Sequence, residues 1–260
     1  MAEVCVLVSV GRHPASGRSR RANRDARAVE LGLRLAGPAL RVVHAGDPAA
    51  PGLRDYLGMG VARLGVLTIG AGDDPVPALI AHLRARPADL ILTGTRAEAG
   101  EDSGLVPYLV AEALGVPLIA AAADVALVDG RARVAQVWPR GRRRGQSAAL
   151  SCLVTVETKA PEARAVAFAL ARRGVIDAMP GVRVADTAAW RPEPARARPR
   201  RLRGARGGTA LQRLAAAMGA VTGASRILVD PEPHVAAQAI WDYLMAEGIV
   251  QAAELPGSAA

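Results

Sequence analysis

The sequence predicts an α/β protein with a doubly wound, mostly parallel Rossmann-like sheet, extended by a β-hairpin and a C-terminal extended and helical arm. Two observations predict this class. Short, nearly continuous apolar runs alternate with stretches of helical spacing over the first 117 residues. Such alternation is typical of parallel strands that helices cover on both faces. The second observation is size, because 260 residues, 51% of them hydrophobic, suffice for one large domain with an appendage.

Four apolar runs are predicted to be the parallel strands, and they span residues 3–10, 40–43, 64–69 and 90–93. Helices are expected between and after them, at residues 23–35, 53–59, 75–86 and 105–114. Asn23 is a suitable N-cap for the first helix, although it could equally contact a ligand. Residues 11–22 are predicted to form a polar, arginine-rich loop.

The pattern changes after residue 117. Two alternating segments, 125–128 and 133–137, flank Asp129-Gly130, and this spacing predicts a β-hairpin. A basic turn is expected at 139–145 and a buried strand at 149–156. Residues 161–173 are expected to form either a helix or an ordered excursion.

The C-terminal quarter has a different composition. Residues 192–208 are rich in proline, glycine and arginine, which is typical of an extended linker or arm. We therefore expect a nucleotide-binding α/β domain at 1–191 and an arm at 192–260. Two helices are predicted in the arm, at 211–218 and 234–248. The apolar face of the second helix requires a packing partner, which is either its own domain or another subunit.

Composition limits the function classes. The net charge is +9, but only 3% of residues are aromatic, so the stacking platforms of nucleic-acid modules are missing. No apolar run reaches the roughly 20 residues of a membrane-spanning helix. Cys5 and Cys152 lie in apolar runs and are expected to be buried thiols, which favours a cytoplasmic protein.

Motifs for catalysis are missing from the sequence. It contains no GxSxG, no P-loop lysine, no metal-ligand spacing and no GxGxxG after the first strand. Whether the chain is an enzyme is uncertain on this evidence. A crevice without catalytic side chains suits a subunit whose cofactor supplies the chemistry.

The strongest candidate site is the loop at 95–103, between the strand at 90–93 and the helix that follows. In open α/β sheets, ligands bind at the carboxyl ends of the strands. Gly11 and Gly94 would let the backbone approach a ligand closely. Asp102 or Ser103 can cap the helix, and the freed amides of residues 104–106 would suit a phosphate. The alternative is a capped connection that binds nothing.

Five segments in order resemble the beta subunit of electron transfer flavoproteins. They are VLVSVGRHP (6–14), NRDARAVELGLRL (23–35), GVARLGVLTIG (60–70), LILTGTRAEAGEDSGLVPYLVAEALGVP (90–117) and LVTVETKAPEAR (153–164). The resemblance covers most of residues 3–190. The chain departs from the family pattern at several points, with Gly11 at the turn lysine, Arg24 at the proline after the asparagine, and Ala160 near the leucine of the recognition loop. The family's glutamine before its helix is also lost or replaced, near Gly104 and Leu105.

The resemblance implies a function and a cofactor. It implies a heterodimer with an alpha subunit that holds FAD, relaying electrons from a dehydrogenase to an acceptor. The beta subunit would hold AMP or a second FAD, and its C-terminal arm would pack on the alpha subunit. By position, nucleotide contacts would fall at Ser9, Asn23, Gly94, Thr95, Asp102, Ser103, Gly104, Leu105 and Val106. The alternatives are a stand-alone adenine-nucleotide-binding domain without electron transfer, and a basic nucleic-acid or scaffold protein.

Overall fold

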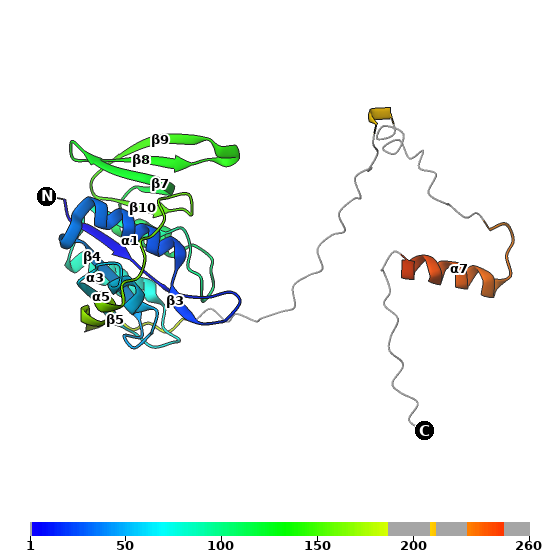
Figure 1. Cartoon of the computed structure of the whole chain (residues 1–260), viewed down its shortest axis with the longest axis horizontal. Coiled ribbons are helices and arrows are strands. Elements are labelled where there is room, and N and C mark those ends of the chain that lie inside the picture. The colour runs from blue at the N-terminus through cyan, green and yellow to red at the C-terminus, as the bar shows by residue number, and fades with distance from the viewer. Residues whose placement is uncertain (1, 187–208, 212–227, 247–260) are drawn as a thin grey trace, which may run out of the picture. The chain divides into compact units, whose positions relative to one another are not determined.

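The computed structural model describes residues 2–186, 209–211 and 228–246 (Figure 1). The chain divides into two compact units, residues 1–190 and 191–260. Each unit is described here by itself.

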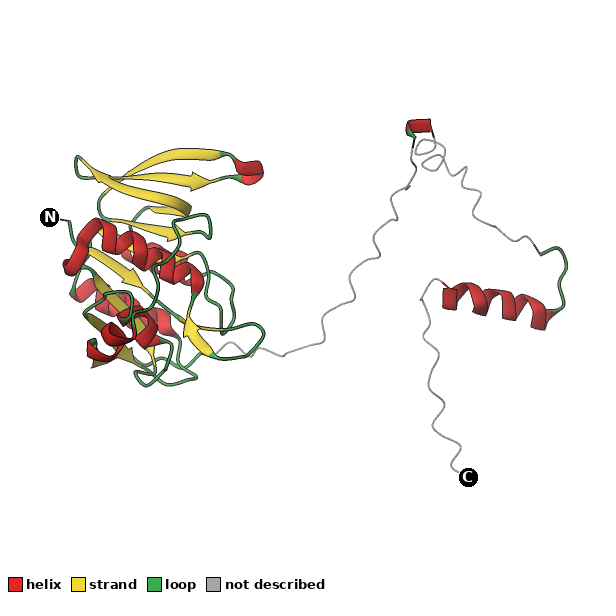
Figure 2. Cartoon of the chain, viewed as in Figure 1, coloured by secondary structure: helices red, strands yellow, loops and turns green. Residues whose placement is uncertain are grey.

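The first unit is built on a nine-stranded sheet with the order β11-β5-β4-β1-β6-β10-β7-β8-β9. Figure 2 shows its strands in yellow and the helices beside them in red. Seven of these strands are parallel, and β8 and β9 extend the sheet antiparallel to β7. The strands are β1 Val4–Leu7, β4 Arg41–Gly46, β5 Arg63–Thr68, β6 Leu90–Gly94, β7 Leu118–Val128, β8 Arg131–Val137, β9 Arg143–Ala149, β10 Cys152–Val156 and β11 Val175–Pro180.

Helices cover both faces of this sheet, which is the doubly wound arrangement that the sequence predicts. They are α1 Asn23–Ala36, α2 Leu53–Leu57, α3 Pro75–Ala85, α4 Val106–Leu114 and α5 Phe168–Arg173, with 3₁₀ turns at Gly37–Ala39 and Pro139–Gly141. Val4 and Val6 of β1 pack with α1 and α2, whereas Cys5 and Leu7 pack with α3 and α4. Alternate residues of a strand thus fill two separate cores. Cys5 and Cys152 are both buried and free, as predicted.

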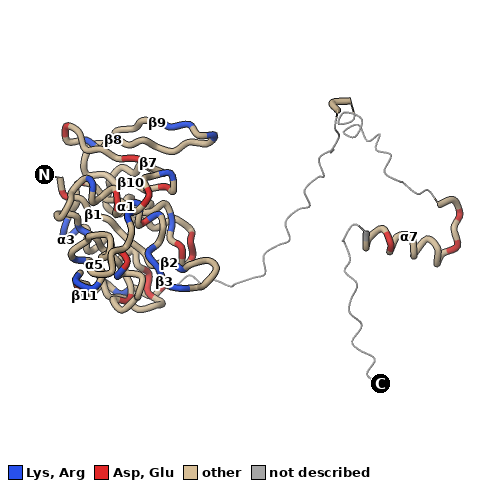
Figure 3. Tube along the Cα trace, viewed as in Figure 1, with Lys and Arg blue, Asp and Glu red and all other residues tan. Residues whose placement is uncertain are grey.

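The predicted hairpin is confirmed. Asp129 and Gly130 join β7 to β8 with positive φ values of 51° and 68°, and Asp-Gly suits a turn of this kind. Figure 3 shows that arginines gather on β9, and that others lie along β2 Val10–Arg12 and β3 Ser19–Arg21.

Three expectations about local structure were wrong. Residues 11–22 do not form a plain loop, because β2 pairs antiparallel with β3 in a separate two-stranded sheet. The basic turn at 139–145 is short, because Arg143 already begins β9, and the strand at 149–156 is split between β9 and β10. The sequence analysis also missed β11, which adds a parallel edge strand beside β5.

The predicted N-cap of the first helix was wrong as well. Ala22 occupies the cap position in extended conformation, and Asn23 is the first helical residue. The side-chain Oδ1 of Asn23 accepts a hydrogen bond from Arg27 Nε at 3.0 Å, one turn along α1. Ala22 has no capping side chain, and the amide of Asn23 donates instead to Oε1 of Glu98 at 2.7 Å.

The second unit contains α7 Pro233–Ala246, in agreement with the helix predicted at 234–248 as far as the description extends. The predicted linker at 192–208 and most of the predicted helix at 211–218 lie outside the described residues. Large apolar and aromatic side chains of α7 are exposed, including Ile240, Trp241 and Tyr243. Among the described residues, no helix is both long and apolar enough to cross a membrane.

Candidate functional site

A large hollow of the first unit lies where β1, β4 and β6 end. We call it the crevice. Its volume is about 420 Å³, and its wall includes the start of α3, the loop after β6 and the start of α4. Apolar side chains form much of this wall, namely those of Leu7, Val8, Val76, Leu79 and Leu109. The crevice is therefore at the edge of the sheet where the sequence predicts a site.

A buried carboxylate closes the base of the crevice. Asp25, in the first turn of α1, is 4% exposed. Its Oδ2 accepts hydrogen bonds from the amide of Ser9 at 2.7 Å and from Ser9 Oγ at 2.5 Å, and its Oδ1 accepts one from the amide of Gly94 at 2.9 Å. The carboxylate thus ties α1 to the ends of two neighbouring strands, β1 and β6.

Burial dominates the electrostatics of this group. Desolvation raises the pKa of Asp25 from 3.8 to about 6, against the opposing effect of its three hydrogen bonds. Gly94 is required here because a Cβ on that residue would overlap Oδ1 of Asp25. The absence of a side chain at Gly94 therefore makes room for the carboxylate of Asp25, not for a ligand.

His44 of β4 also faces the crevice. Its Nδ1 lies 2.9 Å from the carbonyl oxygen of Val8, and burial lowers its pKa below 6.5. The imidazole is therefore neutral at pH 7 and donates through Nδ1 to that carbonyl oxygen, because a carbonyl can only accept. Nε2 is left as an acceptor.

The opposite wall of the crevice is the loop that leads into α4. Asp102 and Gly104 have positive φ values of 51° and 74°, and Ser103 Oγ accepts a hydrogen bond from the amide of Leu105 at 3.3 Å. The amides of Gly104 and Val106 have no hydrogen-bond acceptor among the described residues. Free amides at the start of a helix favour an anion.

Charged side chains lie at the loop side of the crevice. Arg96 pairs with Asp102, with Nε and Oδ1 3.2 Å apart. Asp74 caps α3 by accepting a hydrogen bond from the amide of Val76 at 2.9 Å. Arg96 is therefore one cation among several carboxylates in the crevice wall.

Most residues that the resemblance pointed to are brought together here. Those that line the crevice are Ser9, Gly94, Asp102, Ser103, Gly104, Leu105 and Val106. Thr95 does not line it, because its amide donates to Val156 O at 3.1 Å and its Oγ1 donates to Glu157 at 3.3 Å. Asn23 lines a second, smaller hollow instead.

Gly11 has a different role from the one expected. A Cβ at this position would lie 2.5 Å from Glu98 Oε2 and 3.1 Å from the Cα of Ala22. Gly11 therefore allows close packing against Glu98 and Ala22 of the same chain, and it does not line the crevice.

Sequence reasoning missed several polar residues of the crevice, among them Asp25, His44, Asp74 and Arg96. A signal existed for Asp74, which precedes a proline at the start of an expected helix, as N-caps often do. Asp25 carried no such signal, because an acid in the first turn of a helix is usually explained by the helix dipole alone.

Comparison with known proteins adds to this geometry. The family model described as electron transfer flavoprotein domain matches residues 17–181. The chain belongs to the electron transfer flavoprotein family. It is 43% identical over 256 residues to the electron transfer flavoprotein subunit beta of Chromohalobacter salexigens, covering 96% of this chain and 96% of that protein. The beta-subunit resemblance in the sequence is thereby confirmed over nearly the whole length, and electron transfer is the function that the family supports.

Proposed function

We propose that the chain is the beta subunit of a heterodimeric electron transfer flavoprotein, which relays electrons from a dehydrogenase to an acceptor. FAD would be held mainly by the alpha subunit or shared with it. The observation that carries this proposal is similarity to a beta subunit along 96% of both chains.

The crevice would hold an adenine nucleotide, either AMP or the corresponding part of a second FAD. Its volume of about 420 Å³ is within the range of small-molecule sites. The apolar side chains suit an adenine ring, and the free amides of Gly104 and Val106 suit a phosphate. A flavin in this position would supply electron transfer, whereas AMP would be structural.

Different residues of the crevice would contact different parts of the nucleotide. Asp25 already occupies the hydrogen-bond donors of Ser9 and Gly94. A phosphate is consequently directed to the start of α4, where Ser103, Gly104 and Val106 lie. The neutral Nε2 of His44 is an acceptor for a ribose hydroxyl or an adenine amine on the opposite side.

The division into a nucleotide-binding domain at 1–191 and a partner-binding arm at 192–260 remains part of the proposal. The exposed side chains of Ile240, Trp241 and Tyr243 on α7 support it, because they require an apolar partner in a stable protein. The alpha subunit would supply that partner. We further propose that the heterodimer is cytoplasmic.

Co-expression with the candidate alpha subunit tests the proposal. The chain is purified through a tag that it carries, a visible absorption spectrum is recorded, and released nucleotides are identified by mass. A yellow heterodimer with FAD, or with FAD and AMP, is the expected result for a carrier of one flavin. Two FAD per heterodimer would indicate that the crevice holds the second flavin.

A colourless chain that captures no alpha subunit would overturn the electron-transfer proposal. If that chain still releases an adenine nucleotide, the stand-alone nucleotide-binding domain takes its place. A matched control carries Gly104→Val, which introduces a β-branched side chain at a φ of 74° and beside the Thr95 carbonyl. This variant should keep the alpha subunit while losing the crevice nucleotide.

A further inference from the structure

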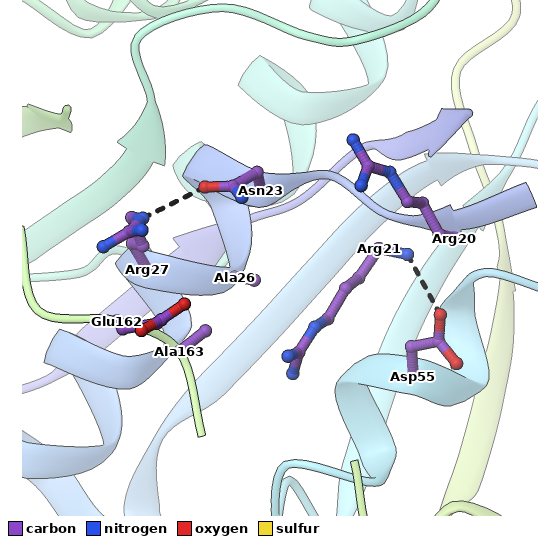
Figure 4. A pocket seen from close by; sticks show the side chains of 8 residues that line it. All are labelled: Arg20, Arg21, Asn23, Ala26, Arg27, Asp55, Glu162 and Ala163. Carbon is purple, nitrogen blue, oxygen red and sulfur yellow. Dashed lines mark hydrogen bonds between the residues drawn. The ribbon is translucent and has the colours of Figure 1, made fainter. Parts of the chain in front are cut away.

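A second hollow of the first unit lies apart from the crevice. We call it the arginine pocket. It has a volume of about 200 Å³ and opens between β3, α1, α2 and the segment that leads to α5 (Figure 4). The side chains that line it are those of Arg20, Arg21, Asn23, Ala26, Arg27, Asp55, Glu162 and Ala163.

Two of its three arginines already have partners. Arg20 Nη2 pairs with Glu98 Oε2 at 2.9 Å, and Figure 4 shows its guanidinium turned away from Arg21. Arg27 donates through Nε to Asn23 Oδ1 at 3.0 Å and through Nη1 to the carbonyl oxygen of Ala160. Nε of Arg20 is buried without a hydrogen-bond partner, but the charge of Arg20 is already paired with Glu98, and Arg27 donates to two groups of the chain.

Arg21 is different. Its backbone amide donates to Asp55 Oδ2 at 3.1 Å, but its guanidinium donates to no described residue. Nη1 is buried and has no hydrogen-bond partner. In Figure 4 the side chain extends into the space between Glu162 and Asp55. Burial lowers the pKa of Arg21, although Asp55 opposes the shift.

Arg21 is partly buried, and its Nη1 is shielded from solvent without an acceptor. This arrangement is costly, since removing a charged donor from water is repaid only when opposite charge and hydrogen bonds replace the solvent. The planar group of Arg21 offers parallel N–H donors, which match the two oxygens of a carboxylate. Asn23 adds a donor, because its Oδ1 is already used by Arg27 and its amide nitrogen has no acceptor among the described residues.

The surrounding charges decide between anions. Asp55 and Glu162 both line the pocket, and neither forms an ion pair with Arg21. Two nearby carboxylates disfavour a doubly charged phosphate more than a singly charged group. We propose that the arginine pocket binds a carboxylate through the guanidinium of Arg21, with the side-chain amide of Asn23 as a second donor. The carboxylate belongs to a small organic acid or to an acidic side chain of a partner protein.

This site does not rest on the proposed electron-transfer function, because no residue of the pocket lines the crevice.

The test uses the full chain labelled with ¹⁵N-arginine. Sodium acetate is titrated at constant ionic strength, and the Nε–Hε signal of Arg21 is followed by NMR. The signal is assigned as the one lost in Arg21→Lys. Arg18→Gln is the matched control, since Arg18 is an exposed arginine of the same hairpin outside the pocket.

The expected result is a saturable shift of the Arg21 signal with acetate, and at least tenfold weaker binding of inorganic phosphate. Acetate binding is then followed by thermal shift in the variants. Arg21→Lys keeps the charge but loses the planar fork, so its affinity should fall at least tenfold. Arg21→Gln should abolish binding, and Arg18→Gln should leave it unchanged.

The same titration on the complex with the alpha subunit distinguishes the two sources of carboxylate. An Arg21 shift in both forms identifies a free organic acid as the ligand. A shift only in the lone chain shows that a partner's acidic side chain fills the pocket. Tighter binding of phosphate than acetate, or equal acetate binding by Arg21→Gln, would overturn the assignment.

Discussion

The crevice and the arginine pocket each contain a charged side chain that is shielded from solvent, but the two side chains differ in their hydrogen-bond partners. In the crevice, the carboxylate of Asp25 receives three hydrogen bonds from Ser9 and Gly94. In the arginine pocket, the guanidinium of Arg21 receives no acceptor from the described residues. The first group therefore finds its hydrogen-bond partners within the chain, whereas the second is left without an acceptor. Four predictions test this difference, from the largest expected effect to the smallest.

Asp25→Ala should produce the largest loss of stability. The substitution leaves two buried backbone amides and one hydroxyl without an acceptor, which costs about 3 to 5 kcal/mol of the free energy of unfolding. Urea unfolding followed by circular dichroism measures it. Glu112→Gln is the control, because Glu112 is exposed on α4. A loss below about 1 kcal/mol would mean that Asp25 does not hold α1 to the strand ends.

Asp25 also predicts a dependence of stability on pH. Its pKa is about 6 in the folded chain and returns to about 3.8 on unfolding, so the folded state binds more protons between these values. The contribution of Asp25 to the free energy of unfolding therefore falls by about 3 kcal/mol as the pH rises from about 4 to 6, and is level above that.

Urea unfolding at intervals of pH between 4 and 7 checks whether the free energy of unfolding falls as the pH rises. Asp25→Asn carries no titratable group, so the slope of stability against pH should be less negative in this variant than in the wild type. Equal slopes in the two proteins would contradict the raised pKa.

How far the sequence predicts this molecule depends on the range of the interactions. The runs that become β1, β4, β5 and β6 are apolar enough to be recognised alone, because buried parallel strands need no distant partner to define their composition. Asp25 is different, since its partners Ser9 and Gly94 are 16 and 69 residues away. Only the assembled sheet brings them together.

The arginine pocket was missed for a related reason. The hairpin of β2 and β3 is short and arginine-rich, so neither alternation nor an Asn-Gly turn marks it in the sequence. Contacts with α2 hold it, including hydrogen bonds from the amide of Arg21 to Asp55 and from the amide of Ala22 to the hydroxyl of Tyr56. Local propensity could not reveal contacts of this kind.

Arg21→Met should act in the opposite direction from Asp25→Ala. The substitution keeps the length of the side chain but removes an unpaired, partly buried charge, and should raise the free energy of unfolding by about 1 kcal/mol in buffer without carboxylates. Thermal unfolding measures it, with Arg18→Met as the control. Adding acetate should then stabilise the wild type but not Arg21→Met, because a ligand that binds only the folded chain shifts the unfolding equilibrium toward the folded state. A loss above about 1 kcal/mol in Arg21→Met would show that the guanidinium already has a stabilising partner.

The smallest expected effect separates two residues that the sequence placed in one site. Ser103 lines the crevice beside the free amides of α4, whereas Asn23 lines the arginine pocket. If the crevice holds a nucleotide, Ser103→Ala should weaken its retention by about 1 kcal/mol, or about fivefold, through loss of one hydrogen bond. Asn23→Ala should leave retention unchanged. Nucleotide remaining after repeated ultrafiltration of the purified heterodimer, identified by mass, measures both. Equal losses in the two variants would mean that the nucleotide reaches α1, and that the two hollows serve one ligand.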